Sequence, residues 1–459
     1  MRPFECDGLS AYRQLAALVC LPETVGQVQA IMRICHELQV PAVPRGAGTG
    51  LSGGALPNSS GVLLMMTKLN RILEIDSQNF CARVEPGVRN ISLSDASRPF
   101  GLYYAPDPSS QFACTIGGNV AENSGGVHCL KYGLTVHNVI GLKIVTVEGE
   151  LLTIGGKTLD APGYDLLAVL CGSEGLLGVV VEATVRLLPC PEHVQVLLAA
   201  FDDVAKACTA VGNVIAAGVI PAGLELMDNL IIQATEDFVH ANYPRHAAAI
   251  LLCELDGVIS EVEEQVKRVQ QVMSDSGAIE IRLAKDTAEQ ALFWKGRKAA
   301  FTAVGRISPD YYCMDGTIPR NRLPDVLIHI AELSKEFGLP VANVFHAGDG
   351  NLHPLILYDA NREGDLNKAE ALGERILELC VSVGGTITGE HGVGIEKLTG
   401  MCIQFNSGEL SQFLAIKTAF DPSGLLNPGK AVPSLHRCAE LGAMHVHHGK
   451  LAFPDLERF

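Results

Sequence analysis

A glycine-rich run at residues 44–54 limits the folds open to this chain more than any other feature. It reads Pro-Arg-Gly-Ala-Gly-Thr-Gly-Leu-Ser-Gly-Gly, and its five glycines leave backbone N–H groups free to approach an anion such as a pyrophosphate. The stretch 48–53 has the glycine spacing of a dinucleotide-binding fingerprint, but that fingerprint needs a long helix beginning inside the glycines. Turn-forming residues follow instead, and 62–66 reads as a buried strand, so the sequence disfavours a Rossmann fold.

Three further stretches share this turn-forming character. They lie at residues 106–110, 115–126 and 172–178. A turn-rich linker explains any one of them, but several in one domain suggest an extended ligand that lies across it.

Histidines and carboxylates gather in another glycine-rich region. The run from His346 to His353 reads His-Ala-Gly-Asp-Gly-Asn-Leu-His, and Gly-Glu-His-Gly follows at 389–392. Residues seven apart face opposite sides of a strand, so the glycines at 348–350 must fold the chain back for the imidazoles to converge. Two imidazoles and the carboxylate of Glu390 make the three-ligand set of a catalytic zinc site. A hairpin whose histidines are satisfied in other ways is the alternative interpretation.

Composition excludes several classes of partner. A formal net charge of −16, without a basic arm, argues against nucleic acid and against an anionic membrane surface. Apolar stretches are interrupted before the roughly 20 residues that span a bilayer, and the N-terminus lacks a signal-peptide pattern, so we expect a cytoplasmic location. The fourteen cysteines include no Cys-x-x-Cys pair, so we expect reduced thiols and neither an iron–sulfur cluster nor a zinc ribbon.

Periodicity divides the chain into a strand-rich first part and an alternating second part. Thr24 is expected to cap a helix, and strands at 139–147, 151–154 and 178–188 follow. Beyond His193, helices and strands alternate, which indicates an α+β domain with a helix-covered sheet. Its expected strands are 194–201, 249–255, 279–283, 310–318, 341–346 and 353–358, and its expected helices are 203–216, 259–274 and 322–337.

The chain resembles, nearly end to end, the FAD flavoproteins of the vanillyl-alcohol oxidase and PCMH-type family, and within it the FAD-linked 2-hydroxy-acid dehydrogenases. Residues 44–54 are similar to the family's pyrophosphate loop, and 115–126 and 172–180 to its isoalloxazine and adenine contacts. The segments 311–316 and 435–440 resemble the FAD-binding subunits of bacterial glycolate oxidases.

The resemblance implies an α+β fold class with three segments. A PCMH-type FAD-binding domain is expected at 1–190, and a substrate domain with helices covering an antiparallel sheet at 191–400. The segment 401–459 is expected to return to the flavin domain and end in a tail, whose His445, His447 and His448 suggest a surface for a partner.

The resemblance also assigns residues to the sites. His346, His353 and Glu390 would bind a divalent metal, zinc. His391 would take the substrate hydroxyl proton, with a capping or core histidine as the alternative, and Arg297 would bind the substrate carboxylate. The loop 44–54 contains no histidine, so FAD is expected to be noncovalent. The expected FAD contacts are Arg45, Gly46, Ala47, Gly48, Thr49, Gly50, Leu51, Gly53, Gly54, Pro106, Asp107, Thr115, Gly117, Gly118, Asn119, Asn123, Gly125, Gly126, Glu174, Gly175, Gly178, Val179 and Asn427.

The implied reaction is the oxidation of glycolate to glyoxylate, and also of D-lactate to pyruvate. Cys313 and Leu355 stand where D-2-hydroxyglutarate enzymes have a lysine and an asparagine, which favours small monocarboxylates. The implied partners are a second flavin-type subunit and an iron–sulfur subunit, through which any contact with the inner membrane would be peripheral. The alternatives are a D-2-hydroxyglutarate or other D-2-hydroxy-acid dehydrogenase acting alone, a zinc hydrolase and a catalytically silent flavin subunit.

Overall fold

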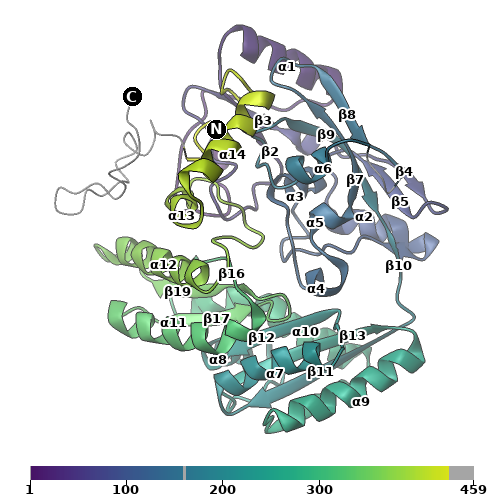
Figure 1. The fold of residues 1–459 in the computed structure, drawn as a ribbon, viewed down its shortest axis with the longest axis vertical. Coiled ribbons are helices and arrows are strands. Elements are labelled where there is room, and N and C mark those ends of the chain that lie inside the picture. Colours follow the sequence, from purple (N-terminus) through teal and green to yellow (C-terminus); the bar gives the residue numbers. More distant parts are fainter. Residues whose placement is uncertain (1, 159–161, 434–459) are drawn as a thin grey trace.

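The computed structural model of the chain describes residues 2–158 and 162–433. Two sheets dominate it, one in each half of the chain, and the C-terminal helices lie beside the first half (Figure 1). The predicted segment 435–440 and the tail histidines lie outside the described residues. Among the described residues, no helix combines the length and the apolar composition needed to cross a bilayer, and the described cysteines are all free.

The first elements place the glycine-rich run between two parallel strands. Thr24 caps α1 (Val25–Glu37), as predicted, and its side chain accepts a hydrogen bond from Gln27 N. Strand β2 (Ala42–Arg45) enters the glycine run, and β3 (Val62–Met65) follows it without an intervening long helix. The expectation that this is not a dinucleotide fingerprint is thus confirmed. Strand β3 pairs in parallel with β2 and with β1 (Leu18–Cys20).

The first half is built on an antiparallel sheet of five strands in the order β4-β5-β9-β7-β8. The predicted hairpin and long strand are confirmed as the β7–β8 pair and β9. The bounds of the sheet strands are Ile72–Asp76 (β4), Cys81–Val84 (β5), Val139–Val145 (β7), Leu151–Gly155 (β8) and Val179–Arg186 (β9). The other elements are α2 (Asn90–Ser97), β6 (Leu102–Tyr103), α3 (Ile116–Glu122), α4 (Cys129–Tyr132), α5 (Thr135–Asn138), α6 (Leu166–Leu170) and β10 (Leu188–Pro189).

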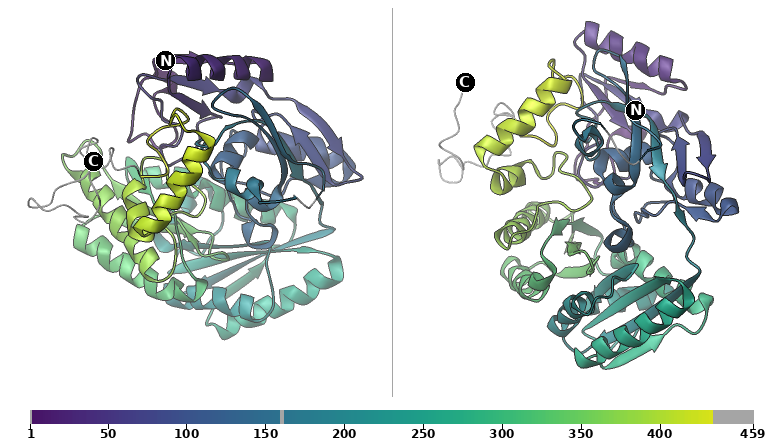
Figure 2. Two further views of the ribbon diagram at one scale, coloured as in Figure 1. Left: turned by 45° about the horizontal axis from the view of Figure 1, so that its top comes forward. Right: turned by 45° about the vertical axis from the view of Figure 1, so that its right-hand side comes forward.

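The second half holds an antiparallel sheet of seven strands in the order β14-β11-β13-β12-β17-β19-β15. Helices α7, α9, α11 and α12 pack on one face, and α8 and α10 on the other (Figures 1 and 2). The strands are β11 (His193–Phe201), β12 (Gly223–Asp228), β13 (Ala249–Gly257), β14 (Glu280–Leu283), β15 (Asp310–Cys313), β17 (Val341–Phe345) and β19 (Pro354–Tyr358). The helices are α7 (Val204–Ala216), α8 (Asn229–Val239), α9 (Ile259–Asp275), α10 (Thr287–Ala303), α11 (Leu323–Phe337) and α12 (Asp365–Ser382).

Burial on both faces explains the apolar strands of this sheet. In β13, Leu251 and Leu255 contribute to the core beneath α7 and α9, while Ile250 and Leu252 contribute to the core beneath α8 and α10. Because both faces are covered, the strand reads as a continuous apolar run rather than an alternating one. This sheet and its helices confirm the predicted helix-covered antiparallel sheet.

One predicted strand was wrong. Residues 310–318 do not form one continuous strand, because the chain leaves the sheet at Met314 and Asp315. Strand β15 pairs with β19, whereas β16 (Gly316–Thr317) pairs with the short β18 (Asn351–Leu352). The break carries the chain toward a cluster formed by His346, His353, His391 and Glu390, called the histidine cluster below.

After α13 (Leu398–Gln404) and α14 (Ser407–Phe420), the chain returns to the first half. Ala42 N donates to Leu425 O at 2.9 Å, and Asn427 N donates to Ala42 O at 2.8 Å. Lys430 Nζ donates to Gly54 O at 2.9 Å. The segment 425–430 therefore lies along β2 and holds the end of the glycine run, while the domain limits at residues 190 and 400 stay predictions.

Candidate active site

A single cavity joins the glycine-rich run to the histidine cluster. Its volume is about 410 Å³, and its wall comes from both halves of the chain. His353, Glu390 and His391 lie in this wall together with the loop 44–51. The predicted FAD contacts that line the cavity are Arg45, Gly46, Ala47, Gly48, Thr49, Gly50, Leu51, Gly54, Thr115, Gly117, Gly118, Asn119, Glu174, Gly175, Gly178 and Val179.

The loop side of the cavity suits an anionic guest. A Cβ atom on Gly50 would stand in open space, with Glu122 Oε1 as its nearest neighbour at 3.8 Å. Gly48 has φ +74°, and its Cβ would overlap the guanidinium of Arg45. Arg45 Nε and Asn119 Nδ2 are buried donors without a hydrogen-bond partner among the described residues. Buried donors without a partner, next to glycine backbone that a ligand can approach closely, fit the pyrophosphate of FAD.

Part of the glycine-rich stretch 115–126 is a helix rather than the expected loop. Thr115 caps α3, and its hydroxyl accepts a hydrogen bond from Gly118 N at 3.3 Å. Asn123 ends the helix in the left-handed conformation. The N-cap at Thr115 and the left-handed C-cap at Asn123 explain how a glycine-containing sequence of low helix propensity forms one short helix.

The other predicted FAD contacts do not line the cavity, and some of them hold its loops. Asn427 Nδ2 donates to Gly54 O at 3.0 Å and to Glu174 O at 2.6 Å. Asp107 pairs with His128 at 3.0 Å. Their direct contact with FAD stays a prediction. These residues are Gly53, Pro106, Asp107, Asn123, Gly125, Gly126 and Asn427.

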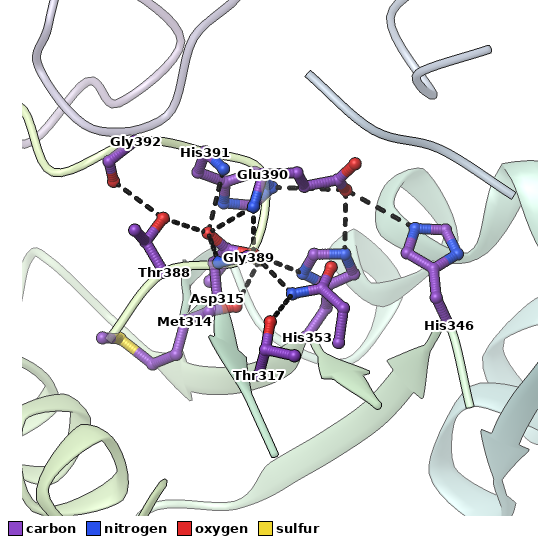
Figure 3. A network of polar contacts seen from close by, with 12 residues as sticks. Met314, Asp315, Thr317, His346, His353, Thr388, Gly389, Glu390, His391 and Gly392 are labelled. Carbon is purple, nitrogen blue, oxygen red and sulfur yellow. Dashed lines mark hydrogen bonds and ion pairs between the residues drawn. The ribbon is translucent and has the colours of Figure 1, made fainter. Parts of the chain in front are cut away.

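The three predicted metal ligands converge (Figure 3). Glu390 Oε1 lies 3.1 Å from His353 Nε2 and 3.5 Å from His346 Nε2. The fold-back occurs at Gly350, which has φ +83°, and the His346 and His353 rings are 5.1 Å apart. Two ligands about 2.1 Å from a tetrahedral metal are roughly 3.4 Å apart, so the donor set fits such an ion. Gly125 makes room for this carboxylate, since its Cβ would lie 2.5 Å from Glu390 Oε2.

A buried carboxylate behind the cluster fixes His346. Glu225 Oε1 lies 2.8 Å from His346 Nδ1, and Glu225 Oε2 accepts from Arg297 Nε at 2.9 Å. Burial lowers the pKa of His346, but Glu225 and Glu390 outweigh it and raise that pKa well above its usual value. Arg297 is only 2% exposed and does not line the cavity. Glu225 was not predicted, because it lies on β12, a strand that was not expected from the sequence.

The predicted base lies against the cluster. The His391 ring stacks on that of His353 with centroids 5.0 Å apart and planes 10° from parallel. Its Nδ1 is buried and has no hydrogen-bond partner among the described residues. Burial lowers the pKa of His391 to about 4, so the ring is neutral at pH 7.

Helix α10 contributes a further wall that was not predicted. Lys298, Phe301 and Thr302 line the cavity, and Tyr311 of β15 lies with them. Positions i, i+3 and i+4 share one face of a helix, which is the sequence signal that could have identified this wall. This wall lines the same cavity as His353 and His391.

Two family descriptions match the chain. The FAD binding domain matches residues 16–155, and the C-terminal domain of FAD linked oxidases matches residues 190–431. The second match alone covers more than half of the chain. The chain belongs to the FAD-linked oxidases. FAD is the cofactor of this oxidoreductase, and the zinc hydrolase considered above is excluded.

Relatives of this FAD-linked oxidase act in 2-hydroxy-acid oxidation. The glycolate oxidase subunit GlcD of Escherichia coli K12 is 64% identical over 100% of this chain and 92% of that protein. A D-lactate dehydrogenase of Anaerostipes hadrus is 32% identical over 93% of this chain and 92% of that protein. The structure of p-cresol methylhydroxylase with substrate bound matches with a TM-score of 0.77 at 18% identity, covering 95% of this chain and 93% of that one, which confirms the PCMH-type fold.

Proposed function

We propose that this FAD-linked oxidase oxidises glycolate to glyoxylate, and D-lactate to pyruvate as a second reaction. The observation that carries the proposal is that His353, Glu390 and His391 share one cavity wall with the glycine-rich loop. The activities for which the two relatives are named support the choice of substrates. Anaerobic mixing with each acid, followed by the loss of flavin absorbance, tests the proposal. A flavin that neither acid reduces would contradict it.

The oxidation removes a proton from the hydroxyl oxygen and a hydride from the carbon that carries it. Noncovalently bound FAD supplies the two-electron acceptor. A neutral ring nitrogen of His391 accepts the hydroxyl proton, and its low pKa keeps it unprotonated above about pH 4. The loops and helix α10 line the cavity in which the substrate would bind.

His346, His353 and Glu390 would hold a divalent metal, zinc, which would lower the pKa of the substrate hydroxyl. Glu225 supports this proposal, since its hydrogen bond to His346 Nδ1 leaves Nε2 facing Glu390. Carboxylates that orient a metal-binding histidine in this way are usual at such sites. Direct zinc analysis of the purified enzyme tests whether the ion is present.

Chelation is expected to lower dye-linked turnover of glycolate by more than about tenfold, because the cluster loses the ion that orients the hydroxyl. FAD should remain bound, because the glycine-rich loop contains none of the proposed metal ligands. Flavin absorbance measures whether FAD is retained. Added zinc should restore the wild type but not a His346→Ala variant. A chelated, zinc-free enzyme with full activity would show that the cluster works without a metal.

We also propose that Arg297 binds the substrate carboxylate. Its guanidinium pairs with Glu225 through Nε and Nη2, and a guanidinium has five N–H donors, so this pairing does not use all of them. Lys298, one position later, lines the cavity, which Arg297 does not, and is the alternative.

D-2-Hydroxyglutarate is expected to be oxidised with a kcat/KM about tenfold to hundredfold below that of D-lactate. Cys313 and Leu355 are paired in register, are buried in the apolar core beneath α10 and do not line the cavity, so neither position supplies a charged partner for a distal carboxylate. A dye-linked assay with both acids at several concentrations measures the ratio. Equal values would indicate a partner for the second carboxylate elsewhere in the wall.

We propose that this chain works in a complex with a second flavin-type subunit and an iron–sulfur subunit. The relative that shares 64% identity is named as a subunit, and this chain has no Cys-x-x-Cys pair of its own. Electrons from the flavin would leave through those partners, on the cytoplasmic side and peripheral to the inner membrane. Co-purification of the tagged chain from its native cells tests this assembly.

A further inference from the structure

Asp315 is a completely buried carboxylate (0% exposed) at the break between β15 and β16. It lies under the turn at 388–392, which carries Glu390 and His391 (Figure 3). The proposed metal and base chemistry does not use it. A buried carboxylate is costly unless it is well hydrogen-bonded, so its partners indicate why it is there.

The backbone of the turn converges on one oxygen of Asp315. Oδ2 accepts from Gly389 N at 2.9 Å, Glu390 N at 3.2 Å and His391 N at 2.9 Å. The hydroxyl of Thr388 donates to the same oxygen at 2.6 Å. Three successive amides around one anion form a nest, in which the anion fixes the backbone of all three residues.

The far side of the turn is also held. Asn351 Nδ2 donates to Asp315 Oδ1 at 2.8 Å, and a Cβ on Gly389 would collide with that same amide. Lys397 Nζ lies 3.5 Å from Asp315 Oδ2 and donates to Gly392 O at 3.0 Å. The turn is therefore clamped between a buried anion, its amide neighbour and a buried cation.

Asp315 lies on the side of the cluster away from the proposed metal. Its Oδ1 is 3.9 Å from His353 Nδ1, whereas His353 Nε2 faces Glu390 at 3.1 Å. Asp315 does not line the cavity. Asp315 would therefore affect the reaction through the residues whose backbone it holds and through the histidines beside it.

We propose that Asp315 is the positioning residue for this active site, a proposal that rests on the proposed oxidation. Its carboxylate fixes the 389–391 backbone so that the His391 ring stacks on His353 and the Glu390 carboxylate faces both histidines. Without the anion, the three amides lose their common acceptor and His391 leaves the geometry needed to accept a proton. Misplacing a reacting group by about 1 Å can cost on the order of a hundredfold in rate.

The test is a double-mutant cycle between Asp315→Asn and His391→Ala, read as the rate constant for anaerobic flavin reduction by glycolate. Asp315→Asn keeps the volume of the side chain but replaces one accepting oxygen with an NH₂ group. Alone it should lower the rate constant about tenfold to a hundredfold with the flavin spectrum unchanged. In the His391→Ala background it should cost clearly less than it does alone, because only Glu390 is then left for Asp315 to position. Full additivity, or no effect of the single change, would overturn the proposal.

Asp228→Asn is the matched control. Asp228 also accepts backbone amides, from Ile231 N at 3.1 Å and Asn343 N at 2.7 Å, but it does not line the cavity. It should leave flavin reduction unchanged, and an equal loss of rate would show that Asp315 acts only through general stability. If Asp315→Asn fails to fold, Thr388→Val removes one hydrogen bond to Oδ2 and should lower the rate about threefold to tenfold. An unchanged rate there would also overturn the proposal.

The outcomes separate this proposal from the proposed function. A wild-type flavin that neither glycolate nor D-lactate reduces contradicts the oxidation itself, and the positioning role falls with it. A wild-type enzyme that is reduced as expected, with Asp315→Asn equal to it, contradicts only the role of Asp315.

Discussion

Replacing His391 with alanine is expected to lower kcat/KM for glycolate by about two to four orders of magnitude, the usual contribution of a positioned base. The neutral ring of His391 lies in the cavity wall, stacked on His353, and burial holds its pKa at about 4. Its loss removes the neutral imidazole that would accept the hydroxyl proton. The measurement is dye-linked oxidation across a range of glycolate concentrations, with flavin content determined on the same sample.

The control for this change is His329→Ala, which removes an exposed imidazole from α11. That variant should match the wild type in both activity and flavin content. If His391→Ala kept more than about a tenth of the wild-type kcat/KM, another group would have to accept the proton, and the alternative view of His391 as a core histidine would be correct.

Replacing Gly50 with valine is expected to give a folded, colourless protein. The Cβ of residue 50 would meet nothing closer than 3.8 Å, and Gly50 does not have a positive φ, so neither a clash nor backbone strain opposes folding. The added side chain would instead occupy the cavity in which FAD is expected to place its pyrophosphate. Absorbance near 450 nm relative to protein, together with thermal unfolding, measures the two effects separately.

Gly48 is a less informative position for this test. Its φ of +74° and its closeness to the Arg45 guanidinium mean that any side chain there strains the protein itself. The better control is Gly156→Val, at a position where a Cβ meets nothing within 4 Å and which does not line the cavity. It should keep its yellow colour. A Gly50→Val protein with full flavin content would show that the cofactor does not lie against this loop.

The sequence alone predicted those parts of the site that depend on local spacing. Two histidines at the two ends of a glycine-containing octapeptide can converge only through a fold-back, and His346 and His353 do converge. The absence of a long helix after the glycine-rich run could also be predicted locally, because turn-forming residues follow the run and the chain then enters β3. Both inferences needed no knowledge of distant contacts.

The supporting residues could not be predicted in this way. Glu225 is 121 positions from His346 in the sequence, and its role depends on β12 lying beside β17 in the sheet. Asp315 was hidden inside an expected strand, because the apolar residues before it continue a strand pattern up to the break. In both cases tertiary contacts, rather than local propensity, decide the position of a charged group.

The return of residues 425–430 to the glycine-rich loop makes the end of that loop depend on residues that are synthesised late. Asn427 and Lys430 both hold the carbonyl of Gly54, and the chain beside Ala42 comes from the same late segment. During synthesis, the first half of the protein emerges long before these residues exist. The loop then lacks the contacts that fix its end. We therefore expect a fragment that ends before residue 425 to bind FAD more weakly than the chain that includes residues 425–430.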